Sequence, residues 1–160
     1  MKKVIVILCV IVAVALIAHK AGYDEGYEVG LSEPKPLSRP YSGTILSGRE
    51  YSGSELTIHA DTDEDYVVSL KDSWGDVYVA FYVRAGETVT VGVPANCLYA
   101  YFACGDHWYG YGKGLMFGKG TSYSRDEEEL DFTQYTYEYT LYPVNDGNFS
   151  ETPSNENEFF

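Results

Sequence analysis

The sequence has 160 residues and a net charge of -13 at pH 7. This length supports one domain with its own core once both ends are set aside. The acidity opposes binding to nucleic acid, because affinity for the phosphate backbone comes largely from Lys and Arg. The three cysteines form no CxxC pair, which excludes the common zinc-ribbon and redox motifs.

The first twenty residues are typical of a membrane-targeting segment. Two lysines precede an unbroken apolar run over residues 4–18, and a histidine and a lysine close it. At about 1.5 Å per residue, a helix over this run is shorter than a ~30 Å hydrocarbon core. The run therefore fits either a signal-peptide core or a short anchor with snorkelling lysines. We expect residues 1–20 to be an uncleaved transmembrane anchor, because no turn-forming residues mark a processing site after Ala15; a cleaved signal is the alternative.

The charges on either side of this run predict its orientation. Lys2 and Lys3 lie before it, and three acidic residues follow it by position 28. The positive-inside rule then leaves the amino terminus in the cytoplasm and the rest of the chain outside. The expected location is the cell membrane, with a single pass and an extracytoplasmic C-terminal domain, or secretion if the signal is cleaved.

Two further stretches lack the composition of a core. Residues 21–40 carry closely spaced glycines and prolines and are expected to form a stalk or linker. Residues 145–160 are polar and acidic and are expected to be a disordered tail, whose final Phe159 and Phe160 are either a docking peptide or a frayed end. This leaves residues 41–144 as the folded domain.

In the body of the chain, apolar and polar residues alternate in at least six short runs separated by turns. This pattern predicts an all-β domain, an antiparallel β-sandwich of Ig-like or jelly-roll-like type. The expected inward-facing sets include Val79, Phe81 and Val83; Val89, Val91 and Val93; and Leu98, Ala100, Phe102 and Cys104. Tyr78, Tyr82, Tyr99 and Tyr101 fall on the opposite faces and are expected to point outward.

Three stretches share a pattern with a known kind of domain: YVVxLKD at residues 66–72, FYVRxGETV at 81–89, and CGxxWYG at 104–110 with later FG and TxY pairs. They resemble a small, uncharacterised β-rich domain that commonly follows a membrane segment in proteins of Gram-positive bacteria. The resemblance covers about residues 54–142. It implies a β-rich fold and an extracytoplasmic location, and it implies no known activity.

The stretch 98–123 has the richest chemistry in the sequence. An alternating aromatic strand ends at Gly105, and an aromatic loop with spaced glycines follows. The candidate ligand-binding residues are Trp108, Tyr109 and Tyr111 in this loop and Tyr78, Tyr82, Tyr99 and Tyr101 on the strands. The alternative for Trp108 and Tyr109 is a cap on the core, which we favour because large aromatic side chains bury much area on folding alone.

An up-and-down succession of strands predicts where the turns lie. The acidic turn 61–65 and the loop with Trp108 and Tyr109 should share one end of the domain, and Trp74 should lie at the other. A clamp of both tryptophans around one sugar is therefore not expected, whereas a single-ended site around Trp108, Tyr109 and Tyr111 stays open as the alternative to a core cap.

Metal binding and catalysis find little support in the sequence. The acidic run 61–65 is not an EF-hand, because Tyr66 stands where that loop needs Gly and Asp72 where it needs Glu. Cys97 and Cys104 would lie ~23 Å apart on an extended strand and face opposite sides, which opposes a shared metal site or a disulfide. The sequence also lacks a nucleophile elbow or a papain-type context. We expect no metal, no cofactor and no enzymatic activity.

The expected function is a membrane-anchored extracytoplasmic binding or interaction module of unknown ligand. Its expected partners are the membrane, through the N-terminal helix, and a cell-surface glycan or an envelope protein. One alternative is a carbohydrate-binding domain that acts through exposed Tyr and Trp side chains. A weaker alternative is a hydrolase with an unrecognised carboxylate site.

Overall fold

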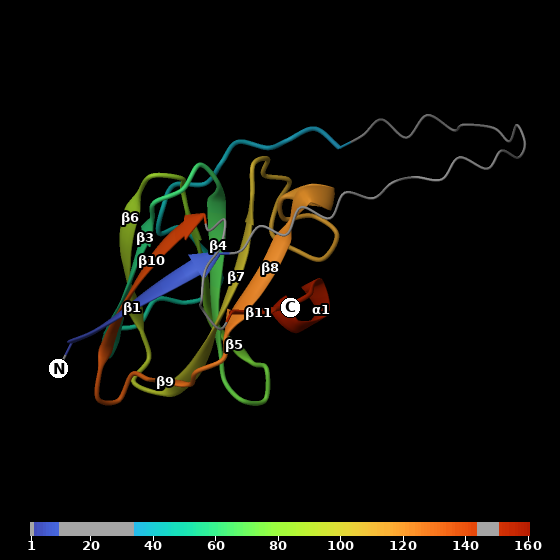
Figure 1. Cartoon of the computed structure of the whole chain (residues 1–160). Coiled ribbons are helices and arrows are strands. Elements are labelled where there is room, and N and C mark those ends of the chain that lie inside the picture. Colours follow the sequence, from blue (N-terminus) through green and yellow to red (C-terminus); the bar gives the residue numbers. More distant parts are fainter. Residues whose placement is uncertain (1, 10–33, 144–150) are drawn as a thin grey trace, which may run out of the picture.

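The computed structural model describes residues 2–9, 34–143 and 151–160. This part of the chain is almost entirely β-structure, which confirms the all-β prediction (Figure 1). The strands are β1 (Lys2–Cys9), β2 (Ile45–Gly48), β3 (Ser54–Ala60), β4 (Asp65–Lys71), β5 (Val77–Val83), β6 (Thr88–Val93), β7 (Cys97–Gly105), β8 (Ser122–Asp126), β9 (Leu130–Asp131), β10 (Thr136–Pro143) and β11 (Glu151–Pro153). Two short helices are η1 (Gly118–Gly120) and α1 (Glu156–Phe159).

The strands form two main sheets. The first is four-stranded, in the order β1-β10-β3-β6. The second runs β11-β8-β7-β4-β5-β2, and β9 pairs with β7 beside it. Most pairs are antiparallel, as expected, but β10 is parallel to both β3 and β1. Local alternation does not reveal this, because β3 and β10 are separated by most of the domain and their pairing is a long-range choice.

A first core cluster draws side chains from both sheets. It contains Phe81 of β5 and Phe102 of β7 from the second sheet, together with Ile58 of β3 and Tyr139 of β10 from the first. The rings of Phe102 and Tyr139 meet edge to face with centroids 5.7 Å apart. The predicted inward faces of β5 and β7 are therefore confirmed. Cys104 is buried in the same cluster, as predicted.

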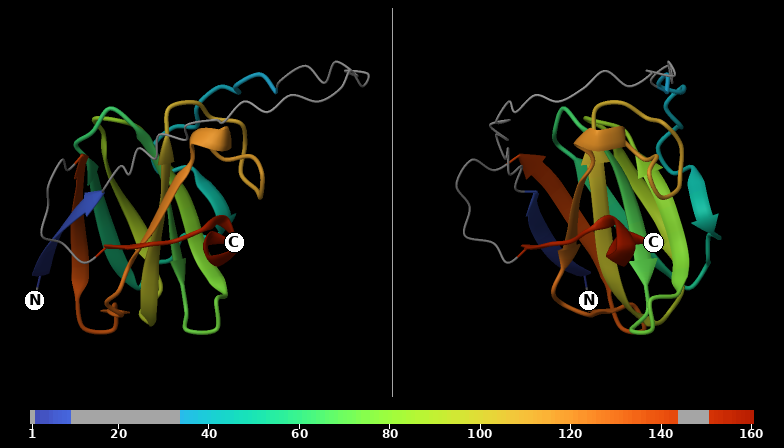
Figure 2. Two further views of the ribbon diagram at one scale, coloured as in Figure 1. Left: turned by 45° about the vertical axis from the view of Figure 1, so that its right-hand side comes forward. Right: turned by 90° about the vertical axis from the view of Figure 1, so that its right-hand side faces the viewer.

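A second core cluster covers the opposite face of the second sheet. Val67, Tyr82 and Ala103 of the central strands pack there with Trp108, Met116, Phe117 and Phe159. Tyr82 does lie on the predicted face, but it is 0% exposed, so the prediction of an outward, accessible Tyr82 is wrong. The reason is tertiary: the loop between β7 and β8 and the segment with α1 fold over this face (Figure 2).

The N-terminal segment differs from its prediction. Lys2–Cys9 forms β1, which pairs in parallel with β10 from Lys2↔Thr136 to Cys9↔Pro143, and the expected helix is not shown. An unbroken apolar run rich in Val and Ile also fits a β-strand, because β-branched residues are enriched in strands, and a short apolar run does not by itself distinguish a strand from a helix. Within the described residues, no helix is both long and apolar enough to cross a membrane. Residues 10–20 of the expected anchor lie outside the described part.

The C-terminal segment also differs from its prediction. The tail over 145–160 was expected to be disordered, but in residues 151–160 β11 pairs with β8 and α1 follows it. The side chain of Asn155 caps α1 by accepting hydrogen bonds from the backbone N–H groups of Asn157 and Glu158. Phe159 is fully buried. Burial of this one aromatic side chain and the cap on α1 order the segment despite its polar composition. Residues 145–150 lie outside the described part.

Candidate ligand-binding site

The loop between β7 and β8 has a defined fold. The backbone N–H of Tyr109 donates to the carbonyl of Met116 at 2.8 Å, and Gly110 and Met116 form an isolated β-bridge. The loop begins after Gly105, a position with no room for a side chain, because a Cβ there would lie 2.5 Å from the Cβ of Phe117. Gly118 has φ +71°, in the left-handed region that glycine adopts without strain.

Trp108 lies inside this loop and not on the surface. Its side chain is 5% exposed, and its ring meets Tyr82 at 5.0 Å and Phe117 at 5.6 Å, both edge to face. The interpretation of Trp108 as a cap on the core is confirmed, and its candidacy as an accessible ligand-binding residue is wrong. The cause is the second core cluster, which needs a large ring above Tyr82.

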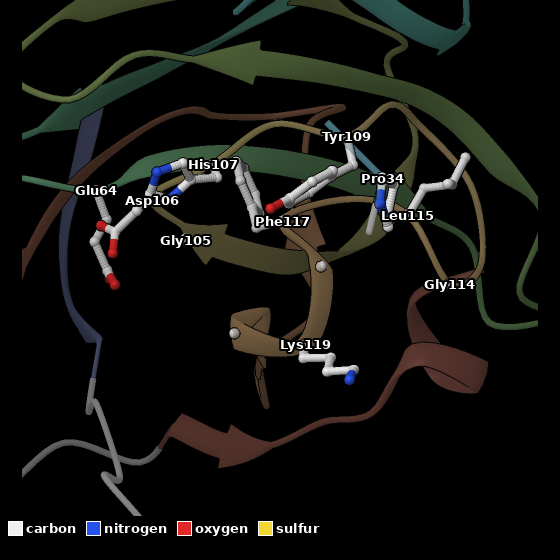
Figure 3. Close-up of a pocket in the computed structure, with 12 residues that line it drawn as sticks. Pro34, Glu64, Gly105, Asp106, His107, Tyr109, Gly114, Leu115, Phe117 and Lys119 are labelled. Atoms are coloured by element: carbon white, nitrogen blue, oxygen red, sulfur yellow. The ribbon is translucent and has the colours of Figure 1, made fainter. Parts of the chain in front are cut away.

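Beside Trp108 the loop borders a cavity of about 450 Å³. The cavity is lined by Pro34, Glu64, Asp106, His107, Tyr109, Leu115, Phe117, Lys119 and the glycines at 105, 114, 118 and 120. Figure 3 shows Glu64, Asp106 and His107 on one side, Pro34 and Leu115 on the other, and Lys119 across from the ring of Tyr109. Carboxylates, a cation and apolar surface thus surround one half-buried tyrosine ring.

The predicted grouping of turns at one end is confirmed. Glu64, from the turn between β3 and β4, lines the same cavity as Asp106 and Tyr109. Asp65 also pairs with Gly105 across β4 and β7. The turn between β4 and β5, which carries Trp74, lies at the opposite end of the sheet from the loop with Trp108 (Figure 2). The end-to-end prediction holds because successive antiparallel strands reverse direction whichever sheet they join.

A buried polar network lies beneath this end of the sheet. Asp65 is 2% exposed, and its carboxylate accepts hydrogen bonds from the hydroxyl of Tyr82 at 2.6 Å and the backbone N–H of Ala85 at 2.8 Å. Arg39 pairs with the same carboxylate at 3.1 Å. Sequence reasoning missed both residues, because it assigned Asp65 to a solvated turn and Arg39 to the stalk. The one signal was the position of Asp65 directly before an apolar strand.

Burial and hydrogen bonding change the acidity of two core tyrosines. Burial, and then the hydrogen bond to Asp65, raise the pKa of Tyr82. Burial, and then the nearby Asp126, raise the pKa of Tyr139 well above its usual value. The hydroxyl of Tyr139 donates to the Asp126 carboxylate at 2.7 Å. Both groups therefore stay protonated in the folded protein at pH values that ionise tyrosine in an unfolded chain.

The protein should lose stability as the pH rises above about 10. In the unfolded chain Tyr82 and Tyr139 ionise near the usual tyrosine pKa of 10, whereas in the folded protein they keep their protons. Above pH 10 the folded state therefore binds more protons than the unfolded state. The free energy of unfolding then falls as the pH rises. Each of the two should contribute a loss of about 1.4 kcal/mol per pH unit above 10 and no slope below pH 9. Urea titrations from pH 8 to 11 measure this. The Tyr139→Phe variant should show a smaller slope, and an unchanged slope would contradict the assignment.

The remaining candidate tyrosines do not form one surface. Tyr78 is half-buried beside Tyr51, with ring centroids 6.4 Å apart. Tyr111 is also half-buried, and its ring meets Phe160 at 5.2 Å. Sugar binding through one exposed cluster of strand tyrosines is therefore not favoured, because Tyr82 is buried and Tyr78 packs beside Tyr51.

Tyr99 and Tyr101 border a second cavity, of about 530 Å³. Its other lining residues are Asp72, Ser73, Trp74, Gly75, Arg125, Asp126 and Glu127. Trp74 is 87% exposed, which makes it the most accessible tryptophan ring of the two. Asp72 holds the Trp74 turn in place, since its carboxylate accepts hydrogen bonds from the backbone N–H groups of Trp74 and Asp76.

Among residues 2–9, 34–143 and 151–160, no group of three or more His, Cys, Asp or Glu side chains is placed to hold a metal ion. The chain was also compared with known proteins. No family model matches the sequence, and neither a curated protein nor a solved structure is significantly similar to it.

Proposed function

We propose that this protein is a binding module on the outer side of the cell membrane, held there by its N-terminal segment, with the two sheets packed as a β-sandwich. The single observation that carries the binding proposal is the cavity around Tyr109. Its volume falls within the ~300–1,000 Å³ of small-ligand and side-chain pockets. The sandwich proposal is supported by the first core cluster, which joins both sheets.

The chemistry of the cavity favours a peptide loop of an envelope protein as the partner. Glu64 and Asp106 attract a cationic side chain, and Leu115 and Pro34 offer apolar surface a short distance away (Figure 3). The net charge of -13 adds long-range attraction for a basic partner. Tyr109 lies between these groups, and tyrosine is enriched among the residues that carry most of the binding energy at interfaces.

Changing Tyr109 to Ala should reduce partner capture about tenfold or more, because a tyrosine at the centre of an interface commonly supplies over 1.4 kcal/mol. The measurement is capture from envelope extracts by the purified full chain, with each captured protein then titrated individually. The matched control is Tyr99→Ala, another half-buried tyrosine that lies outside this cavity. Unchanged capture by a folded Tyr109→Ala variant would contradict the proposal.

The membrane anchor is supported by the apolar run 4–18 and the charges that flank it. The structure uses part of the same run as β1. The two arrangements exclude each other. With Lys2–Cys9 in the sheet, only residues 10–18 of the apolar run are left to cross the membrane. A helix of these residues, at about 1.5 Å per residue, is shorter than half of a ~30 Å hydrocarbon core. We place the run in the membrane because Lys2 and Lys3 before it and acidic residues after it match the charge pattern of an anchor.

The mature protein should fractionate with membranes and keep Lys2 and Lys3, as mass spectrometry of extracted protein can determine. Deletion of residues 1–20 should release a folded domain whose melting temperature is within a few degrees of that of the full chain, because under this proposal the run lies in the membrane and its pairing with β10 as β1 is not needed for the fold. An amino terminus near Leu16 would instead establish a cleaved signal. A large drop in melting temperature on deletion would establish β1 as an essential strand.

Carbohydrate binding is the second candidate, and the exposed ring of Trp74 favours it. Trp74, Tyr99 and Tyr101 present aromatic surface beside the acidic Glu127 and the cationic Arg125 in one cavity. Two of the carboxylates in this cavity, Asp72 and Asp126, accept backbone hydrogen bonds in turns, which favours binding over hydrolysis. On this candidate, Trp74→Ala abolishes binding to a glycan array and Tyr109→Ala leaves it unchanged.

A further inference from the structure

Residues 151–160, here called the docking segment, attach to the second sheet as a peptide ligand attaches to a receptor. β11 extends the sheet antiparallel to β8, with Thr152 opposite Arg125 and Pro153 opposite Ser124. The backbone N–H of Ser154 then donates to the carbonyl of Tyr123 at 3.1 Å. Addition of a strand to a sheet edge is a recurring mode of peptide recognition, in which main-chain bonds supply affinity.

Two aromatic anchors follow the strand. Phe159 is fully buried in the second core cluster, and its ring lies 5.5 Å from that of Tyr123. Phe160 is half-buried, with its ring 5.2 Å from that of Tyr111. These contacts define a docking face on the body of the protein, made by Val67, Lys71, Tyr101, Ala103, Tyr111 and Tyr123. Buried aromatic anchors of this kind dominate the energetics of peptide interfaces.

Lys71 gives the docking face a specific polar contact. It lies on β4 and is 2% exposed, and its ammonium group donates to the backbone carbonyl of Glu158 at 2.7 Å. The same ammonium lies 5.0 Å from the centre of the Tyr101 ring. Burial, and then the charge of Lys113, lower the pKa of Lys71. Burying a cation costs free energy unless a hydrogen-bond acceptor faces it. The docking segment supplies such an acceptor to Lys71 through the carbonyl of Glu158.

The polar part of the docking segment is matched to the loop between β7 and β8. The side chain of Lys113 donates to Asn157 at 3.2 Å, and the backbone N–H of Gly114 donates to the Glu156 carboxylate. The segment also orders itself, because Asn155 caps α1 and its side-chain amide donates to Glu158 at 2.8 Å. The docking segment thus contacts the rest of the protein through its side chains and through strand pairing. A separate peptide with the sequence of residues 151–160 could make the same contacts.

We propose that the docking face is a peptide-binding site that residues 151–160 fill within one chain, and that the same segment of a second copy of this chain is its ligand between chains. A second copy is the occupant that fits, because it carries the strand, the cap and both aromatic anchors in the observed order. In such an exchange, residues 151–160 of each chain would make with the other chain the strand, aromatic and Lys71 contacts that they make here within one chain. Such an exchange forms a closed two-fold dimer, the arrangement of domain-swapped proteins.

The test uses the full chain and a fluorescent synthetic peptide of residues 151–160. In the Phe159→Ala chain the built-in segment is weakened, so the peptide should bind saturably and at least tenfold more tightly than it binds the wild-type chain, whose own segment competes at an effective concentration of about millimolar. A peptide with the same Phe159→Ala change should bind at least tenfold more weakly. Lys71→Met in the receiving chain should also weaken binding.

Absence of saturable binding to a folded Phe159→Ala chain overturns the peptide-site proposal. If that variant does not fold, as circular dichroism will show, Phe160→Ala replaces it, because Phe160 is only half-buried. Sedimentation of the wild-type chain at rising concentration tests the second copy as ligand. We expect a dimer that Phe159→Ala abolishes, and a wild-type chain that stays monomeric at millimolar concentration overturns this part.

Discussion

Replacing Phe102 with Ala should lower the free energy of unfolding by about 3–5 kcal/mol. The ring is 1% exposed at the centre of the first core cluster, and its edge-to-face contact with Tyr139 joins the two sheets. Its removal loses apolar burial and leaves a cavity, because strands paired on both sides of β7 prevent collapse into the space. A domain with ~5–15 kcal/mol of stability is brought close to unfolding by this change. A urea titration followed by circular dichroism measures it.

Tyr99→Ala is the matched control for Phe102→Ala. Tyr99 lies on the same strand but faces the other side of the sheet and is only half-buried, so its loss should be much smaller. Equal losses at the two positions would indicate that burial on the two faces is equivalent, contrary to the structure. The comparison therefore tests the register of β7, in which a slip by one residue exchanges the two faces.

The inward faces were predictable because alternation along a strand is a local property. In β5 and β7 every second residue enters the first core cluster, as the period-two pattern indicates. The second core cluster was not predicted, although the sequence carries a trace of it. Val67 and Ala103 lie on the face opposite the first core cluster, and apolar residues there indicate a sheet buried on both sides.

What covers this second face depends on segments remote in the sequence. Trp108 and Phe117 arrive from a glycine-rich loop, and Phe159 arrives from a stretch whose composition is that of a disordered tail. A prediction of disorder from composition uses the average over the whole stretch. It does not detect that a single residue, Phe159, packs into a complementary surface elsewhere in the protein. A single N-cap asparagine followed by two phenylalanines was the available signal.

The location of the candidate cavity was predictable, but its lining was not. Strand direction alone places the 61–65 turn and the loop after β7 at one end, and Glu64 and Tyr109 do meet there. Which aromatic side chain stays accessible is decided by packing. Trp108 turns toward Tyr82, and Tyr109, its neighbour, borders the cavity.

Trp108→Ala should cost about 3–5 kcal/mol of the free energy of unfolding. The indole ring is held between Tyr82 and Phe117 at the top of the second core cluster, and the backbone carbonyl of Trp108 accepts a 2.7 Å hydrogen bond from Leu37. Loss of the ring removes the edge-to-face contacts with Tyr82 and Phe117 and with them the support of the loop that forms the cavity. Ligand binding should therefore be lost together with stability.

The matched control is Trp74→Ala, the same substitution at an 87% exposed ring at the opposite end of the sheet. Surface changes of this kind are usually within ±0.5 kcal/mol, so the urea midpoint should barely move. If both variants unfold at the wild-type midpoint, Trp108 is not a core residue and the loop does not close over Tyr82. If Trp108→Ala alone shifts the midpoint, the ring is a structural cap, and any binding at this end of the domain depends on its neighbour Tyr109.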